Sequence, residues 1–214
     1  MPSEASSPTT SVRATRQGDV LLLALDDPTD FPRLSRAVLH ALRKQMDVLA
    51  RASELRAAVL TGTEKCYAAG AELEEVAALT PHEALRFSAL GQSVMRAIER
   101  SAKPIVAAIR GFCLGGGFDL AMACHLRVAA TDAVFGHPGG SLGILTGWGG
   151  TQRLPRLLAR AGRSRALEAL TTGRRITAEE AYGWGLVNRL APPEAVLPTA
   201  LRLAANCSLR HAPG

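Results

Sequence analysis

Three consecutive glycines, followed two positions later by an acid, have the residue types and spacing for chemistry: Gly115, Gly116, Gly117 and Asp119. Glycine permits sharp turns and lets other groups approach the backbone closely. If a helix begins at this turn, its first N–H groups have no partner within the helix, and they lie at the positive end of its dipole. The stretch therefore predicts a site for negative charge with a carboxylate beside it.

Several kinds of glycine turn compete with simple close packing of a helix on a strand. A P-loop ends in Gly-Lys-Ser/Thr, whereas this turn continues with Gly117, Phe118 and Asp119. A dinucleotide fingerprint has a third Gly or Ala after two spacers, where this chain has Leu120. The remaining interpretation is an oxyanion hole, in which a backbone N–H stabilises charge on a carbonyl oxygen. An oxyanion hole needs a second donor.

The elements that position these donors are predicted strands. The glycine run follows residues 104–109, which are continuously apolar after Pro104 and predict a buried strand. The second donor is expected in residues 66–73, Cys-Tyr-Ala-Ala-Gly-Ala-Glu-Leu, which follow the strand-like run 57–61. Small residues there let a ligand reach the main chain, and Gly70 permits a turn. Each donor segment is therefore expected directly after a strand.

Together these two segments resemble the crotonase superfamily (the enoyl-CoA hydratase/isomerase family), whose members carry aromatic-x-Ala-Gly-x-Asp and Gly-Gly-Gly-x-Glu/Asp-Leu-Ala segments. The likeness continues in the family's order through residues 135–138, 147–155, 173–181 and 185–187, and covers roughly residues 12 to 195. The resemblance implies a ClpP/crotonase-like spiral of ββα units. The predicted elements by themselves indicate only an α/β fold.

The resemblance also implies an acyl-CoA thioester as substrate and partner, with coenzyme A entering as part of the substrate and no separate cofactor. The thioester oxygen is expected between the N–H groups of Ala71 and Gly116, with Asp119 as the acid-base residue. Contacts with the acyl-CoA are expected from Leu34, Ala69, Glu72, Leu73, Gly115, Pro138 and Gly139. The Asn-Ala-Leu-Ser/Asn segment usual in the family is only partly matched by residues 32–35, Pro-Arg-Leu-Ser.

Proton transfer is where the chain departs from the family pattern. Hydratases of the family hold and activate water with two glutamates, one in the glycine helix and one after the Phe-Gly-x-Pro turn. Here Asp119 occupies the first place and Gly139 the second, so the two-carboxylate hydration mechanism is not expected intact. Asp119 alone could serve an isomerisation or a slow hydration, with His137 or water as partner. We expect Gly139→Glu to increase hydration if the pocket is closed.

Other reactions stay open at this point. Dihydroxynaphthoyl-CoA synthases also have glycine at the second position and recruit bicarbonate, so Gly139 could open a pocket for a small anion. Decarboxylation of a malonyl-type thioester needs mainly the oxyanion hole. Binding of acyl-CoA without turnover is a further alternative. A different class, an RNA or acidic-lipid binder, is suggested by five arginines in thirteen residues, although such a run is more often a solvated or subunit-facing surface. These are Arg153, Arg156, Arg160, Arg163 and Arg165.

Composition bounds the remaining possibilities. The 214 residues are 47% hydrophobic, which is enough for one substantial core, and no apolar stretch is long enough to span a membrane. The net charge is +6. The four cysteines form no Cys-x-x-Cys pair, which predicts free thiols in a reducing compartment, the cytoplasm. The five histidines lack metal-ligand spacing, so no metal is expected.

The chain is expected to divide into a disordered tail (1–11), a crotonase-like core domain (12–192) and the start of a shortened C-terminal helical region (193–214). The resemblance implies a homotrimer or hexamer, if the short C-terminus allows it. Strands are expected at 12–14, 20–25, 126–130 and 134–136. A helix capped by Ser35 should bury Val38, Leu39, Leu42, Met46 and Leu49, and a helix opened by Pro81 should bury Leu85, Leu90, Val94 and Ile98.

Overall fold

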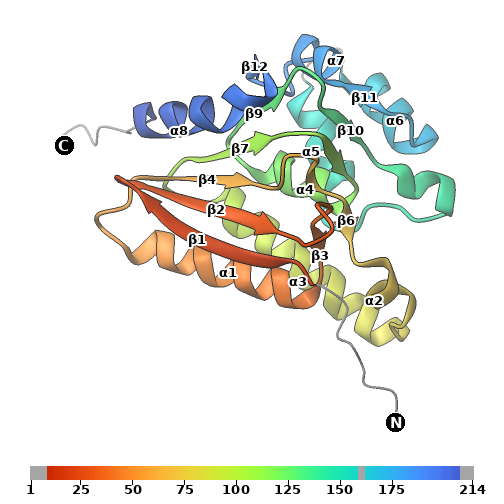
Figure 1. Ribbon diagram of the computed structural model, residues 1–214. Coiled ribbons are helices and arrows are strands. Elements are labelled where there is room, and N and C mark those ends of the chain that lie inside the picture. The colour runs from red at the N-terminus through yellow and green to blue at the C-terminus, as the bar shows by residue number, and fades with distance from the viewer. Residues whose placement is uncertain (1–8, 159–161, 208–214) are drawn as a thin grey trace.

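The computed structural model describes residues 9–158 and 162–207 (Figure 1), with the side chains of residues 141 and 142 also outside that description. Its largest sheet has six strands in the order β1-β2-β4-β7-β9-β12. These are β1 (Ser11–Gln17), β2 (Val20–Asp26), β4 (Ala57–Thr61), β7 (Ile105–Ile109), β9 (Leu126–Ala130) and β12 (Arg189–Ala191). Among the described residues of this sheet, β1 and β2 pair antiparallel and every other pair of neighbouring strands is parallel. Every residue of β4 and β7 is buried, and all of them except Thr61 are apolar, as expected for parallel strands covered on both faces.

A second sheet has the order β11-β10-β8-β5, and a third consists of two short strands. The second contains β5 (Cys66–Ala68), β8 (Phe112–Leu114), β10 (Val134–Gly136) and β11 (Ile176–Thr177), and the third pairs β3 (Arg33–Leu34) with β6 (Gly70–Ala71). A strand of the large sheet is repeatedly followed by a strand of the second sheet and then a helix. The expected α/β class and the expected ββα repeat are therefore present.

Helices complete the layers. They are α1 (Arg36–Arg51), α2 (Leu73–Ala77), α3 (Pro81–Glu99), α4 (Gly116–Ala123), α5 (Gly150–Leu157), α6 (Gly162–Thr172), α7 (Ala178–Gly183) and α8 (Val196–Asn206), with 3-10 turns η1 (Pro138–Leu142) and η3 (Pro193–Ala195). Helices α1 and α3 pack together on one side of the molecule, and α8 packs on β7 on the opposite side (Figure 1). No helix in the described ranges has the length and apolar character needed to cross a bilayer.

The two long helices test the sequence-based expectations. Ser35 accepts a hydrogen bond from the Val38 N–H and caps α1, whose buried residues are the five predicted. In α3 the buried residues are Phe87, Gly91, Val94, Met95 and Ile98. The prediction for Leu85 is wrong, because its side chain is 72% exposed. Leu85 precedes Phe87 by two residues, so it points away from the buried stripe of a 3.6-residue helix.

The first and last described elements lie near the expected domain boundaries. Ser11 already belongs to β1, one residue before the expected start of the core, and residues 1–8 of the expected tail lie outside the described part. In the predicted C-terminal region, α8 buries Val196, Ala200 and Ala204. It packs against β4, β7 and β9. This helix therefore belongs to the same hydrophobic core as the large sheet.

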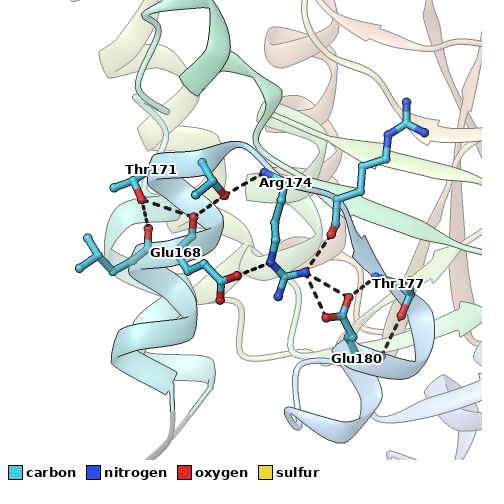
Figure 2. Close-up of polar contacts among 8 residues, drawn as sticks. Glu168, Thr171, Arg174, Thr177 and Glu180 are labelled. Atoms are coloured by element: carbon cyan, nitrogen blue, oxygen red, sulfur yellow. Dashed lines mark hydrogen bonds and ion pairs between the residues drawn. The ribbon is translucent and has the colours of Figure 1, made fainter.

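Arg174 connects helices α6 and α7. Figure 2 shows Arg174 between Glu168 of α6 and Glu180 of α7, with nitrogen–oxygen distances of 2.8 and 3.1 Å. Thr177 and Glu180 form the capping box that begins α7. The guanidinium also lies 5.3 Å from the ring centroid of Trp184. These contacts fix the turn after α6, the helix that packs against η1.

Candidate active site

The glycine run lies where β8 ends and α4 begins. Gly115 has φ of +52°, and its N–H donates to the Gly136 carbonyl at 2.9 Å. A Cβ added to Gly116 would lie 2.3 Å from the ring of Trp148, and one added to Gly117 would lie 2.3 Å from the carbonyl oxygen of Ala68. No side chain therefore fits at the start of α4, because an indole ring and strand β5 occupy the space.

The second predicted donor segment touches this turn. Gly70 has φ of +112°, and a Cβ added there would lie 3.5 Å from the Gly116 nitrogen. Ala71 follows in β6, paired in parallel with Leu34 of β3. Residues 71 and 116 are separated by 45 positions in the sequence, yet both line one cavity. The fold thus brings together the two segments from which donors were expected.

That cavity has a volume of about 280 Å³ and a mostly apolar lining. Of the ten predicted site residues, eight line it: Ala69, Ala71, Leu73, Gly115, Gly116, Asp119, Pro138 and Gly139. Leu34 is fully buried and is the strand partner of Ala71, and Glu72 faces the guanidinium of Arg33 at 3.5 Å. A larger hollow of about 600 Å³ between α1 and α3 contains none of the predicted site residues.

Asp119 is the carboxylate of the cavity. It lies in the first turn of α4 and is 1% exposed. The hydroxyl of Thr146 donates to its Oδ2, and its Oδ1 lies 3.5 Å from Nε2 of His137. Burial raises the pKa of Asp119 to about 6, although the Thr146 hydroxyl and the charge of Arg153 act in the opposite direction. The group is therefore ionised at pH 7 but close to its protonated form.

His137 faces Asp119 from the residue after β10. Its ring is 5% exposed and packs on Phe118 with the centroids 5.1 Å apart. Burial lowers the pKa of His137 to about 4, so the imidazole is neutral at pH 7. Neither of its ring nitrogens has a hydrogen-bond partner among the described residues. A neutral imidazole beside the carboxylate has one donor and one acceptor to offer.

The position expected for a second carboxylate, Gly139, is crowded on the side where a side chain would begin. A Cβ added to Gly139 would lie 2.7 Å from the carbonyl oxygen of Ile144, and the Ile144 N–H donates to the Gly139 carbonyl at 2.8 Å. A glutamate at 139 therefore requires the segment around Ile144 to move. The expected gain in hydration from Gly139→Glu therefore depends on that movement, while Gly139 itself lines the cavity.

Arg153 corrects the prediction of an arginine surface. It is 9% exposed, and it donates to the Trp148 carbonyl at 2.9 Å and to Glu99 at 2.8 Å. Arg156, one turn later, is exposed and hydrogen-bonds only to Gln152 among the described residues, while Arg160 lies outside the description.

Thr146, Trp148 and Arg153 were not predicted as site residues. The signal that could have found them is the glycine pair at 149 and 150, because two adjacent glycines beside a tryptophan indicate crowded neighbours.

Known proteins resemble this chain over most of its length. A family model described as Enoyl-CoA hydratase/isomerase matches residues 15–211. The crotonyl-CoA hydratase of Syntrophomonas wolfei is 38% identical over 190 residues, which are 88% of this chain and 72% of that protein. The short-chain-enoyl-CoA hydratase of Clostridium acetobutylicum is 37% identical over 190 residues, with the same coverage of 88% and 72%. The crystal structure of enoyl-CoA hydratase from Bacillus anthracis has a TM-score of 0.85 at 35% identity, covering 92% of this chain and 76% of that one.

Proposed function

Because the chain belongs to the enoyl-CoA hydratase/isomerase family, the crotonase superfamily, we propose that it acts on an acyl-CoA thioester through an enolate with Asp119 as its single acid-base carboxylate. The predictions of family, of crotonase-type fold and of an enzyme are confirmed by these similarities.

Stabilisation of the enolate oxygen is assigned to the N–H groups of Ala71 and Gly116. The contact between their two turns supports this assignment, as does the position of Gly116 at the positive end of α4. Removal of one oxyanion donor typically costs about 2.7 to 4 kcal/mol of transition-state stabilisation. The coenzyme A part is assigned to the mouth of the same cavity, with the Ala69 carbonyl accepting a hydrogen bond from adenine.

One observation carries the ranking of reactions: Asp119 is the only carboxylate lining the cavity among the described residues. A double-bond isomerisation needs one acid-base group. The carboxylate removes a proton from C2 of a 3-enoyl thioester, the C–H electron pair forms the enolate, and the same carboxyl returns the proton to C4. The product is the 2-enoyl thioester. Hydration has to activate water and protonate carbon, so it is expected to be slower here.

The test is incubation with 3-enoyl-CoA and 2-enoyl-CoA of one chain length. Isomerisation is read from the absorbance of the conjugated thioester, and hydration from the mass of one added water. We expect isomerisation to exceed hydration, and Asp119→Asn to lose both. Faster hydration than isomerisation would contradict the single-carboxylate mechanism. Binding of both esters without turnover of either would leave a protein that only binds acyl-CoA.

Assembly and location are part of the proposal. We assign the protein to the cytoplasm because of its free cysteines, and we assign it a trimeric or hexameric assembly because the family implies one. The four cysteines are free, and Cys66, Cys113 and Cys124 are buried, as a reducing compartment allows. Light scattering on the purified chain measures the oligomeric state, and a monomer at micromolar concentration would contradict the assembly.

A further inference from the structure

Two adjacent glycines separate a buried cation from the carboxylate of the cavity. Gly149 has φ of +110°, and a Cβ added to it would lie 2.2 Å from a guanidinium nitrogen of Arg153. A Cβ added to Gly150 would lie 2.3 Å from Oδ1 of Asp119 and 2.8 Å from Nε2 of His137. The guanidinium therefore packs on one side of this turn, and the carboxylate and imidazole pack on the other.

The segment that leads into these glycines also holds Asp119. Thr146 donates its hydroxyl to the carboxylate, and the ring of Trp148 fills the space beside Gly116 and Gly91. The backbone carbonyl of Trp148 is in turn held by Arg153 at 2.9 Å. Segment 146–150 is thus attached to the carboxylate at one end and to the arginine in its middle.

Arg153 is itself fixed from a third element. Its other terminal nitrogen donates to Glu99 at the end of α3, at 2.8 Å, across 54 positions of sequence. The guanidinium is buried while the Glu99 side chain is 50% exposed, so the arginine is the desolvated partner of the pair. One side chain therefore connects α3, α5 and segment 146–150.

We propose that Arg153 is a positioning residue for Asp119. Through its hydrogen bonds to the Trp148 carbonyl and Glu99, it holds segment 146–150 against the carboxylate. Its positive charge also acts on that carboxylate across the glycine pair. The inference rests on the proposed function only in giving Asp119 an acid-base role. It assigns a function to a residue whose sequence context predicts a surface cation.

The charges around Asp119 set the sign of the effect of Arg153 on its pKa. From α5 the group is faced by Arg153, from the end of β10 by His137, and from β8 by Cys113, whose pKa is raised well above its ordinary value by burial. The imidazole and the thiol are neutral at pH 7, so Arg153 is the nearby charge. Its removal should raise the pKa of Asp119. Removal of the Glu99 charge leaves the arginine uncompensated and should lower that pKa.

The experiment is a carboxyl ¹³C NMR titration of aspartate-labelled protein, with the Asp119 resonance identified by its loss in Asp119→Asn. We expect Arg153→Met to raise the Asp119 midpoint by about half a pH unit or more, and Glu99→Gln to lower it. Arg153→Lys keeps the charge but loses the fork to Trp148 and Glu99, so its midpoint should lie between those of Arg153→Met and the wild type. The control is Arg156→Met on the same helix, whose arginine is exposed, and it should not move the midpoint.

The inference would be overturned if Arg153→Met and Glu99→Gln shifted the Asp119 midpoint in the same direction, or if neither shifted it. Arg153 would then contribute only to packing. If Arg153→Met does not fold, Glu99→Gln decides, because its side chain is half exposed and its change is small. The titration needs no substrate. Absence of wild-type turnover would therefore reject the proposed reaction while the midpoint shifts still test Arg153.

Discussion

At the scale of single residues, the properties of Asp119 follow from where it is buried. It lies in the first turn of α4, where an acid interacts favourably with the helix dipole, yet almost none of it reaches solvent. Desolvation is the larger effect, and it raises the pKa to about 6. A carboxyl with that pKa can both accept and return a proton near neutral pH, as a single-carboxylate mechanism requires.

The pH dependence of turnover should report this group. Only the ionised carboxylate removes a proton, so kcat/KM is expected to be flat above pH 7 and to fall tenfold per unit well below about 6. The pKa of His137 is lowered to about 4, so this side chain adds no second limb near 6. The measurement is a pH–rate profile. A limb near 4, where an unperturbed aspartate titrates, would contradict the buried-carboxylate account.

The same group makes a contribution to stability with a definite sign. Its pKa in the folded chain is raised above the value of 3.8 expected when unfolded. Stability from the protonated form is therefore fully present below about pH 3.8 and is lost as the pH rises through about 6. A shift of about two units corresponds to about 3 kcal/mol. Chemical denaturation of wild type and Asp119→Asn at pH 4 and pH 7 should show the variant gaining relative stability at the higher pH.

At the scale of elements, the start of α4 depends on space that only glycine leaves. An alanine Cβ at 117 would lie 2.3 Å from the carbonyl oxygen of Ala68, which is backbone and cannot move without shifting β5. We expect Gly117→Ala to cost about 1 to 3 kcal/mol of stability and to lower turnover, because it displaces the turn that presents Gly116. The measurements are thermal unfolding and kcat.

Gly183→Ala is the matched control for that substitution. Gly183 ends α7, has nothing within 4 Å of an added Cβ, and lies away from the cavity. Alanine there should be neutral or should stabilise the protein by about 0.5 to 1 kcal/mol, because glycine is the poorer helix former. Equal destabilisation by both substitutions would show that the crowding at Gly117 is not the cause.

The elements also show what a sequence can and cannot predict. Local signals were sufficient for α1, where the cap at Ser35 and a regular apolar stripe occur together. They failed for Leu85, because α3 contains apolar residues on more than one side and only packing decides which side is buried. The burial of Arg153 could not be predicted for another reason. Its partner Glu99 is 54 positions away, and the pattern of charges along one helix carries no information about so distant a partner. The crowding at Gly139 comes from Ile144, five positions later, and it depends on how the irregular turn between them folds, for which the sequence has no periodic signal.

At the scale of the whole molecule, the cavity lies where successive ββα units meet. Strands β5 and β8 lie side by side in the second sheet, so the turns that follow them meet although they are 45 positions apart. The third unit contributes His137 and segment 146–150, which close around Asp119. The chain covers 72% of the length of the hydratases from Syntrophomonas wolfei and Clostridium acetobutylicum, and the family model matches residues 15–211, which include both donor segments, Asp119 and Arg153.

The central claim is that two backbone donors and one carboxylate form a thioester enolate. The most direct measurement is incubation of a saturated acyl-CoA in deuterium oxide, with the mass of the recovered ester followed over time. Enolate formation predicts deuterium uptake at C2 by the wild type and its loss in Asp119→Asn, while calorimetry shows that the variant still binds the ester. No uptake by the wild type, or undiminished uptake by Asp119→Asn, would contradict the account.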